Sequence, residues 1–503
     1  MENGVMLQGF HWYTSNGGVH WNWLISQVEL YRKMGITALW LPPPYKCDKP
    51  ADNVGYAPYD LYDLGEYSQK GQVKTKYGSG DELRRLCTKI REQGLQVYID
   101  AVFNHKAGAD NTERVRAIVV AMDDRTREIG SWIDIDAWTK FDFAGRLSDQ
   151  QGRKRSKKTW AWQDFDAVDA AKNLPTWGPT VFKIKNKPFQ TAVSWEYGNY
   201  DYLCYADIDM DVDDAREDLK KWGHWILREL NANGFRLDAV KHVRSFFFKE
   251  FAEHIRHNQP DTFFVGEYWA TWSTRDLHRF ISDTAGLVHL FDVPLQTKFH
   301  KISQAIPKSS GDLRDLVTGT LSAEQPALAV TFVQNHDTQP CQKLEQCVEP
   351  WFVPWAYAFI LLREQGYPAV FLPDLTGADY TDQGRYVVLY SHEWVIRRLL
   401  AARHHCAWGV QIDYFDHPNT VGWMRLGNAQ HAGMAVLISN GSSMGWKWMD
   451  TGRANCPFKD ILGHRTETLW SDHTGWACFT VNSESCSVWV PEDVVYWIEQ
   501  MLM

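Results

Sequence analysis

The sequence lacks any long apolar run and any leader-like start. No stretch approaches the ~18 to 20 consecutive apolar residues that a membrane-spanning helix needs. The amino end, from Met1 to Trp12, has neither the basic segment nor the apolar core of a secretory leader. We therefore expect no membrane partner and, with Met1 as the native start, a cytoplasmic location.

An excess of positive charge is absent as well. Lys and Arg number 53 against 62 Asp and Glu, which gives a formal net charge of −9. Interfaces with nucleic acids or anionic membranes need clustered cations that replace the counterions of phosphate groups. The charge balance therefore argues against a nucleic-acid partner and favours a neutral substrate.

Cysteine spacing excludes a further class of site. The nine cysteines are an odd number and none of them follows C-x-x-C spacing, so we expect no structural zinc site. In a cytoplasmic protein their thiols remain reduced.

Aromatic residues, by contrast, are abundant, with 25 Trp, 21 Tyr and 24 Phe. Flat apolar rings with a polar edge can stack on sugar rings, although core packing is the commoner role of any single Trp. With 503 residues, of which 44% are hydrophobic, the chain is long enough for two or three domains, or for one α/β barrel with insertions.

Several segments repeat one pattern, in which an amphipathic helix, a Gly or Pro stop and a short apolar strand follow one another. In the first clear case, apolar residues at helical spacing over 83–90 precede Gly94 and the apolar run 95–103. The same order recurs around Gly234 and Pro260. This alternation predicts a parallel sheet covered by helices, either doubly wound or closed as a barrel.

The number of strands favours a (β/α)8 TIM barrel, and no Gly-rich phosphate motif of a dinucleotide-binding fold follows the first strand. The active site of such a barrel lies at the carboxyl ends of its strands. The acids predicted there are Asp100, Asp238, Glu267 and Asp337. The eight expected strands are Val5–Phe10, Thr37–Leu41, Leu95–Phe103, Phe235–Val240, Thr262–Glu267, Leu290–Val293, Leu328–Gln334 and Ala369–Leu372.

Two stretches interrupt the repeated pattern. Residues 105–207, after the third strand, are rich in Trp, Asp and Lys and predict an irregular inserted domain, here domain B. Short alternating segments after about residue 405 predict an antiparallel β-sandwich, domain C, with a short tail. We therefore expect the barrel, domain A, in two parts, 1–104 and 208–404, followed by domain C over 405–503.

Asp238 and Glu267 end consecutive strands. Neighbouring strands lie about 4.8 Å apart, so the two carboxyl groups can approach the ~5 to 5.5 Å separation of retaining glycosidases. One acid then attacks the anomeric carbon while the other, kept protonated, protonates the leaving oxygen. We expect Arg236, on the same face of its strand as Asp238, to hold that carboxylate ionised. The aromatic residues around Glu267 are expected to raise its pKa.

Two alternatives compete with this interpretation. Any single acid is more often part of a structural salt bridge, but four acids at four strand ends are harder to explain that way. A metal-dependent barrel hydrolase also places acids and histidines at strand ends. The sequence has no histidine ligand pair on an early strand, which ranks this alternative low.

Four segments follow one another along the chain around the acids named above. They are Asp100-Ala-Val-Phe-Asn-His105, Gly234-Phe-Arg-Leu-Asp-Ala-Val-Lys-His242, Val265-Gly-Glu-Tyr-Trp269 and Phe332-Val-Gln-Asn-His-Asp337. In this order they resemble the signature regions of the α-amylase family of glycoside hydrolases. The likeness extends from Gly9 to about Val490, and the segments 55–65 and 202–211 are similar to the bacterial liquefying-type α-amylases in particular.

The resemblance implies a role for each site residue. Asp238 is then the nucleophile, Glu267 the general acid/base and Asp337 the stabiliser of the oxocarbenium-like transition state. It also implies a set of substrate-binding residues, with a stacking ring, hydrogen-bonding histidines and two residues that face the leaving group. That set is Tyr56, His105, Arg236, His336, Lys241 and His242.

The family also implies structural calcium between the barrel and the insertion. The ligands carried over are Asn104, Asp201, Asp207 and the backbone carbonyl of His242, and such oxygen ligands suit a hard cation. Liquefying-type members often hold a further metal cluster with acids near Asp166 and Asp209 and a Trp-Asp-Trp-Glu stretch. This chain has the shorter 191–196 without that Asp, so we do not expect the additional cluster. The last strand also departs from the family, with Phe371-Leu-Pro-Asp374 in place of Tyr-Gly-Asp.

The expected activity is endo-hydrolysis of α-1,4-glucosidic bonds in starch, glycogen or maltodextrins, with retention of configuration, by a monomer that needs calcium. A 4-α-glucanotransferase uses the same covalent intermediate and stays open as the alternative. A non-catalytic glucan-binding protein is the third possibility, and the intact acids Asp238, Glu267 and Asp337 argue against it.

Overall fold

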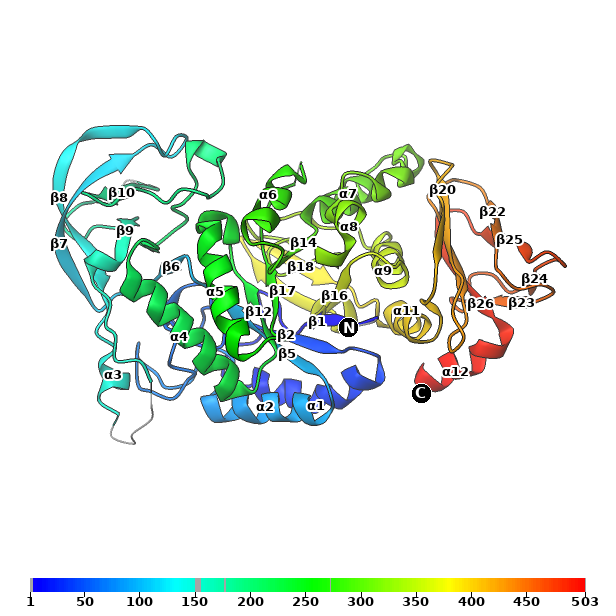
Figure 1. Ribbon diagram of the computed structural model, residues 1–503, viewed down its shortest axis with the longest axis horizontal. Coiled ribbons are helices and arrows are strands. Elements are labelled where there is room, and N and C mark those ends of the chain that lie inside the picture. Colours follow the sequence, from blue (N-terminus) through cyan, green and yellow to red (C-terminus); the bar gives the residue numbers. More distant parts are fainter. Residues whose placement is uncertain (1–2, 150–154, 176–177, 272, 503) are drawn as a thin grey trace.

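A closed barrel of eight parallel strands forms the centre of the computed structural model, which describes residues 3–149, 155–175, 178–271 and 273–502 (Figure 1). The strand order is β1-β16-β15-β14-β13-β12-β5-β2. Every strand expected from the sequence is present, so the predicted barrel is confirmed. The strands are β1 Met6–Gln8, β2 Ala38–Leu41, β5 Gln96–Ala101, β12 Gly234–Leu237, β13 Phe263–Gly266, β14 His289–Phe291, β15 Ala329–Phe332 and β16 Tyr367–Phe371.

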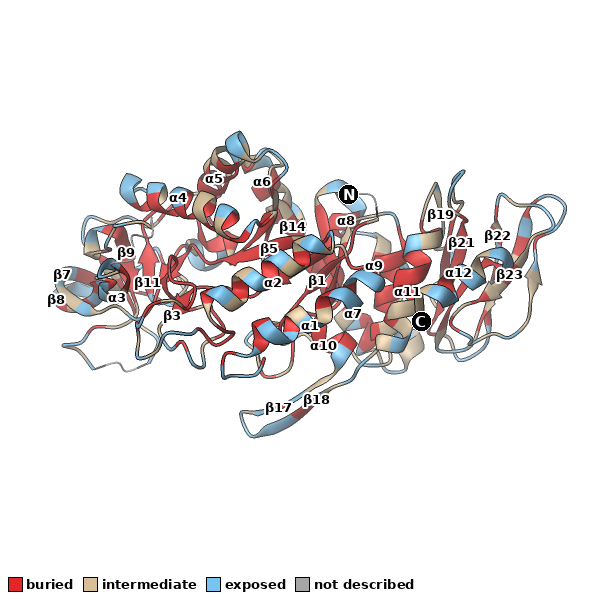
Figure 2. Cartoon of the chain, turned by 90° about the horizontal axis from the view of Figure 1, so that it is seen from below, coloured by how far each residue is buried: buried red, intermediate tan, exposed pale blue. Residues whose placement is uncertain are grey.

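The covering helices follow from local sequence signals, as α2 (Gly80–Glu92) illustrates. Ser79 caps its first turn in a reciprocal capping box with Glu82, an arrangement worth about 1 kcal/mol. Its apolar stripe is buried and its outer face is exposed (Figure 2). The other helices of the barrel part are α1 His20–Lys33, α4 Asp213–Leu230, α5 Ser245–Asn258, α6 Arg275–Asp283, α7 Val293–Ser303, α8 Leu321–Glu324, α9 Val353–Leu362, α10 Leu372–Thr376 and α11 Glu393–Cys406.

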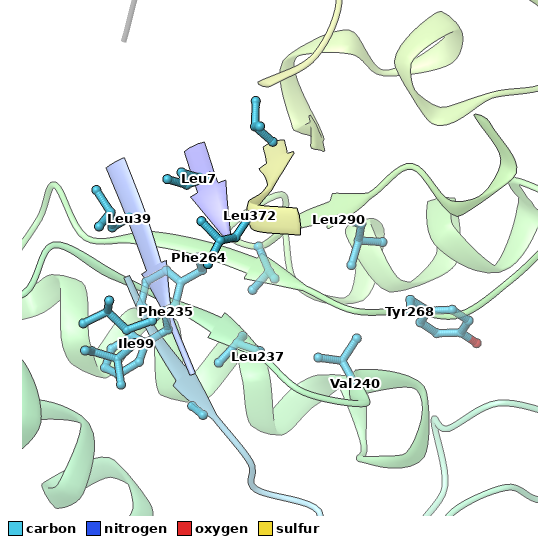
Figure 3. Close-up of a cluster of buried hydrophobic side chains, with 14 of the residues drawn as sticks. Leu7, Leu39, Ile99, Phe235, Leu237, Val240, Phe264, Tyr268, Leu290 and Leu372 are labelled. Carbon is cyan, nitrogen blue, oxygen red and sulfur yellow. The ribbon is translucent and has the colours of Figure 1, made fainter. Parts of the chain in front are cut away.

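Side chains of the barrel strands alternate between two hydrophobic cores, because successive residues of a strand point to opposite faces. Leu7, Leu39 and Phe235 belong to the core between strands and helices (Figure 3). Trp40 and Tyr98 belong to the core enclosed by the strands. Burial on both faces explains why the strands read as continuous apolar runs in the sequence.

The chain between β5 and α4 forms a six-stranded antiparallel sheet at the end of the molecule opposite the C-terminal sheets (Figure 1). This regular sheet was not predicted from the sequence, which suggested only an irregular insertion. Its order is β6-β11-β9-β10-β7-β8. The bounds are β6 His105–Lys106, β7 Asn111–Val120, β8 Glu128–Lys140, β9 Phe165–Val168, β10 Val181–Ile184 and β11 Ala206–Ile208, with the short helix α3 Ala144–Leu147 between β8 and β9.

The last hundred residues form two antiparallel sheets that pack face to face on a shared core containing Met449, Phe479 and Trp489. This arrangement confirms the predicted β-sandwich. The larger sheet has the order β19-β20-β21-β26-β23-β24, with β19 Gln411–Tyr414, β20 Thr420–Arg425, β21 Met434–Ser439, β26 Ser485–Pro491, β23 Pro457–Asp460 and β24 Leu469–Trp470. The smaller sheet pairs β22 Gly445–Asp450 with β25 Trp476–Val481, and the helix α12 Glu492–Leu502 packs on α11.

Two further hairpins leave the barrel. The first, β3 Lys46–Cys47 with β4 Pro58–Asp60, follows β2. The second, β17 Ala378–Asp382 with β18 Arg385–Leu389, follows β16 and projects from the body of the molecule (Figure 2). All nine cysteines are free thiols. Within the described ranges, no helix has both the length and the apolar character required to cross a bilayer.

Candidate active site

Three of the four acids singled out from the sequence meet at the carboxyl ends of β5, β12 and β13. Asp100 lies in β5, Asp238 directly follows β12 and Glu267 directly follows β13. Two backbone bonds of 2.9 Å fix the last two acids to the sheet, from Asp238 N to Ala101 O and from Glu267 N to Leu237 O. Asp238 and Glu267 are therefore immediate neighbours across two hydrogen-bonded strands, as expected.

Arg236 joins these three acids. Its guanidinium is fully buried, and Nη1 donates to Asp100 Oδ1 at 3.0 Å and to Asp238 Oδ1 at 2.6 Å. Nη2 donates to Glu267 Oε2 at 2.7 Å. Because one planar guanidinium spans both groups, the carboxyl groups of Asp238 and Glu267 lie within a few ångströms of each other.

Burial dominates the electrostatics of these acids. It raises the pKa of Asp238 to about 6, with Arg236 opposing the shift and Asp100 adding to it. Arg236 acts in the direction expected from the sequence, since its charge and hydrogen bond favour the ionised carboxylate, but loss of hydration has the larger effect on the Asp238 pKa. Burial also raises the pKa of Glu267, and the charge of Arg236 again opposes this shift. The aromatic surroundings anticipated for Glu267 are consistent with this direction.

Asp337 lies beyond the end of β15, in a turn after Phe332. The Asn335 side chain closes the turn by accepting from Asp337 N and Thr338 N, both at 2.9 Å. Burial and the charge of Glu267 raise the pKa of Asp337 well above its ordinary value. His336 Nε2 lies 3.2 Å from Asp337 Oδ2, and Gln8 holds the other ring nitrogen at 3.0 Å.

Tyr56 and the two predicted histidines line the same site. The Tyr56 ring stacks on His336 with 5.0 Å between centroids, and its hydroxyl donates to Asp100 Oδ2 at 2.7 Å. His105 Nε2 lies 2.9 Å from the carbonyl oxygen of Tyr56. Burial lowers the pKa of His105 to about 4 and that of His336 well below its usual value. Both rings are therefore neutral near pH 7 and act as hydrogen-bonding groups.

Lys241 and His242 lie beside these acids, just after Asp238, on the side formed by the insertion. Lys241 Nζ contacts Glu196 Oε1 at 2.9 Å and the Trp269 carbonyl at 3.2 Å. His242 Nδ1 lies 2.8 Å from the Tyr200 carbonyl. Glu196 was not predicted as a site residue, because its place beside Lys241 depends on how the insertion folds back over the barrel.

The four predicted calcium ligands also come together. The Asn104 side-chain nitrogen lies 2.9 Å from Asp207 Oδ1 and 3.5 Å from the carbonyls of both Asp201 and His242. Asp166 adds a buried carboxylate, since ligand atoms of Asp166, Asp201 and Asp207 lie within 4.8 Å of one another. The sequence analysis did not include Asp166 among these ligands.

The donor set of this carboxylate cluster fits a hard cation. Burial raises the pKa of Asp166, Asp201 and Asp207, which expresses the cost of gathering three anions without a counter-charge. Among the described residues, both carboxylate oxygens of Asp166 and Oδ2 of Asp207 have no hydrogen-bond partner. A divalent cation with oxygen ligands satisfies exactly such atoms.

Asp209, the next acid along the chain, has its charge balanced differently. Lys187 Nζ forms an ion pair of 2.7 Å with Asp209 Oδ2, and Gln190 Nε2 donates to Oδ1 at 3.0 Å. The chain therefore neutralises Asp209 with the positive charge of Lys187.

The acid that follows the last strand, Asp374, has a structural role. Asp374 is buried and accepts from Tyr357 Oη at 2.6 Å and from Gln334 Nε2 at 2.9 Å. Gln334 precedes the turn that carries His336 and Asp337. Asp374 thus anchors that turn to α10, directly after the neighbouring strand β16, a role that sequence spacing alone did not indicate.

Comparison with known proteins gives consistent matches. A family model described as "Alpha amylase, catalytic domain" matches residues 10–344. The chain is 44% identical to an "Alpha-amylase" of Geobacillus stearothermophilus, over 97% of this chain and 87% of that protein. It is 43% identical to an "Alpha-amylase" of Bacillus licheniformis (97% and 93%) and 40% identical to the "Cytoplasmic alpha-amylase" of Escherichia coli strain K12 (98% and 100%).

Solved structures with low sequence identity share the fold. An α-amylase from Geobacillus thermoleovorans in complex with acarbose aligns with a TM-score of 0.64 at 17% identity, covering 97% of this chain and 98% of that one. A cyclomaltodextrin glucanotransferase named CldA aligns with a TM-score of 0.66 at 18% identity, covering 97% and 99%. The same architecture therefore supports both hydrolysis and sugar transfer, and only the site can distinguish them.

Proposed function

Because this chain belongs to the α-amylase family, we propose how its residues carry out the family's reaction. The enzyme is a glycoside hydrolase that cleaves internal bonds of α-1,4-glucans. The observation that carries the residue assignment is the Arg236 guanidinium, which binds the carboxyl groups of Asp238 and Glu267 together at the end of the barrel.

In the first step, the Asp238 carboxylate attacks the anomeric carbon as the bond to the leaving oxygen breaks. Glu267 gives its proton to that oxygen, so the shortened glucan leaves as an alcohol. In the second step, Glu267 takes a proton from water, whose oxygen attacks the same carbon and releases Asp238. Two displacements at one carbon give retention of configuration.

The remaining residues bind and orient the sugar at the bond that breaks. We assign Asp337, His336 and His105 to hydrogen bonds with sugar hydroxyl groups that stabilise the charged transition state, and their position around the buried acids supports this role. Tyr56 offers a ring face for stacking. Lys241 faces the leaving-group side, together with its partner Glu196.

Water as the acceptor is tested with maltotriose. Under hydrolysis, the number of reducing ends rises and maltose and glucose accumulate. Longer oligomers without a net gain in reducing ends would instead identify a 4-α-glucanotransferase, which uses the same two acids. A non-catalytic glucan-binding protein would leave maltotriose unchanged.

The pH dependence of kcat/KM is expected to reflect the raised pKa values. Turnover requires ionised Asp238 and protonated Glu267, so the rate rises as pH increases through about 6 and falls once Glu267 loses its proton. The apparent values belong to the pair, because both acids share Arg236. A profile of initial rates on a soluble maltooligosaccharide checks this. An acid limb near the ordinary carboxyl value of about 4 would contradict it.

We also propose that the carboxylate cluster binds calcium through Asn104, Asp201, Asp207 and the His242 carbonyl, with Asp166 as an additional ligand. The bound ion ties the insertion to the barrel, because Asp166, Asp201 and Asp207 belong to the insertion whereas Asn104 and His242 follow barrel strands. It takes no part in the two displacements described above.

Chelation is expected to destabilise the protein. One calcium ion per chain is predicted, since Lys187 already neutralises Asp209. Ligand binding to the folded state alone adds about 4 kcal/mol at 1,000 times Kd, so removal of the ion should lower Tm by several degrees, reversibly. Metal content after gel filtration and thermal unfolding check this. Asp207→Asn should lose the ion, while the exposed-site control Asp123→Asn should keep it; two ions per chain would contradict the role of Lys187.

We further propose the domain division 1–104 with 208–404, 105–207 and 405–503, and a cytoplasmic location. The location is supported by 40% identity to a protein named cytoplasmic α-amylase. Stored glycogen or imported maltodextrin would then be the natural glucan, acted on by a monomer.

A further inference from the structure

A short loop of the insertion is fastened to the barrel beside the catalytic acids. Ser194 N donates to the carbonyl oxygen of Lys241 at 2.8 Å, and Glu196 Oε1 accepts from Lys241 Nζ at 2.9 Å. Lys241 follows the nucleophile Asp238 by three residues. The loop therefore borders the side of the site at which the leaving group departs.

Trp195 lies between these two anchored residues. Its side chain is 74% exposed, more than that of any other tryptophan among the described residues. An indole that stays in water adds nothing to the hydrophobic core, so packing does not explain its presence. A single exposed aromatic residue far from a site needs no explanation. This one is different, because the residues before and after it both contact Lys241.

The backbone around Trp195 is closed into a tight turn. The carbonyl oxygen of Trp195 accepts from Gly198 N at 3.1 Å. Tyr197 has a left-handed backbone with a φ of 52°, and its carbonyl oxygen accepts from Arg125 N at 2.7 Å. Because the turn is fixed on both sides, the position of Trp195 is set before a ligand arrives, and less conformational entropy is lost on binding.

One face of the Trp195 ring has a cationic neighbour. The Arg279 guanidinium lies over the ring, 6.0 Å from its centroid. Arg279 Nη2 in turn donates to the carbonyl oxygen of Val193 and to Tyr268 Oη, each at 3.3 Å. Tyr268 directly follows Glu267, so this support also begins beside a catalytic acid. With most of the side chain exposed, the opposite face of the ring is open to a ligand.

The ligand that fits this place is the departing part of the glucan. A sugar ring presents a flat set of C–H groups that packs on the face of an indole. The glucan beyond the bond that breaks runs along the side bordered by Lys241 and Glu196, and Trp195 is the aromatic residue that this border exposes.

We propose that Trp195 is a specificity-determining residue, which stacks on a sugar of the leaving-group side and thereby influences which bond is cleaved. The inference rests on the proposed function, since it takes the glucan as the ligand and Asp238 and Glu267 as the reacting acids. Binding energy at Trp195 favours those positions of the glucan in the cleft that place a sugar on this ring. The indole takes no part in the two displacements.

The test compares a substrate that has sugars on the leaving-group side with one that has none. Maltoheptaose supplies such sugars, whereas α-maltotriosyl fluoride releases only fluoride. In Trp195→Ala, the ratio of kcat/KM on maltoheptaose to kcat/KM on the fluoride is expected to fall about tenfold. Maltoheptaose labelled at its reducing end should also give shorter labelled fragments, because weaker binding on the leaving-group side moves the favoured cleavage toward the reducing end.

Three variants control for indirect effects. Trp195→Phe keeps a flat ring and should retain most of the wild-type ratio. Trp497→Ala removes a tryptophan of α12 that is 58% exposed, and should leave the ratio and the fragment pattern as in the wild type. Trp195→Leu keeps apolar bulk without a flat face, and it decides the matter if the alanine variant does not fold in a thermal unfolding experiment.

Three outcomes would overturn the proposal. The first is a wild-type ratio and fragment pattern in Trp195→Ala, and the second is the same change in Trp497→Ala. The third is an equal loss of rate on both substrates, which would make Trp195 only a support of the loop. Failure of the proposed function looks different, because the wild-type protein would then release no reducing ends from maltoheptaose.

Discussion

Asp238→Asn is expected to abolish hydrolysis of soluble starch, with kcat lowered roughly 10⁴-fold or more, as for loss of other catalytic nucleophiles. The amide is almost the same size as the carboxylate but cannot attack the anomeric carbon. It also keeps an oxygen that can accept from Arg236 Nη1, so the fold should persist. Reducing-end release over hours gives the residual rate, and thermal unfolding gives the stability.

The matched control is Asp213→Asn in the first turn of α4, where the carboxylate is exposed and pairs only locally with Arg216. It should keep wild-type activity. Wild-type turnover by Asp238→Asn would remove the nucleophile assignment, whereas an unfolded variant is distinguished by its thermal transition. Glu267 would then need a different partner acid.

Arg236→Leu is expected to have the second-largest effect, on stability and activity together. The substitution leaves Asp100, Asp238 and Glu267 buried without the guanidinium that binds all three. Removing one partner of a buried charge group costs about 3 to 5 kcal/mol. The pKa of each acid rises further, so the protonated forms are favoured in the folded state. The loss of stability should therefore be larger at pH 8 than at pH 5, and Asp238 should remain protonated over most of the working range.

Urea unfolding at the two pH values and kcat/KM measure these effects. Arg363→Leu is the control, because Arg363 is buried and forms an ion pair of 2.7 Å with the exposed Asp413, away from the site. It should lower stability and leave activity in place. Retained activity in Arg236→Leu, or a loss of stability that does not depend on pH, would contradict the proposal that Arg236 balances the charges of all three acids. Arg236→Lys should recover part of the stability, since it keeps the charge but not the fork of donors.

The barrel could be predicted from the sequence because its strands are buried on both faces and separated by helices with clear stops. Ser79, Gly94 and the apolar run 95–103 are local signals, and each describes one unit of the repeat. Asp238 and Glu267 could be paired for the same reason, since consecutive strands of such a barrel are neighbours. Their separation then follows from strand spacing.

The inserted sheet was missed although part of its signal was present. In β8, the buried residues Ile135, Ala137 and Thr139 alternate with more exposed ones, which is the period of a half-buried strand. The long polar surroundings hid this short alternation. Glu196 and Lys187, and the place of Asp166 among the calcium ligands, were missed for a different reason. The residues that they contact are distant in sequence, and no local sequence pattern predicts which loop packs beside which acid.

The pKa of Asp238 shows the limit of reading charges from sequence. The spacing of Arg236 and Asp238 in the sequence correctly indicated an ion pair between them, but not how deeply that pair is buried. Burial reverses the net direction of the shift, and burial is a property of the assembled barrel. The sequence therefore predicted the contact and the direction in which Arg236 acts, but not the larger opposing effect of burial.

The backbone bonds that tie Asp238 and Glu267 to adjacent strands have a consequence for how this protein can diversify. Residues at the rim of the site, such as Glu196 beside Lys241, lie on loops and on the insertion, which tolerate substitutions and changes of length more readily than a sheet does. New preferences for chain length or branching can therefore accumulate by mutation in those segments. The spacing of the reacting groups is inherited unchanged with the barrel.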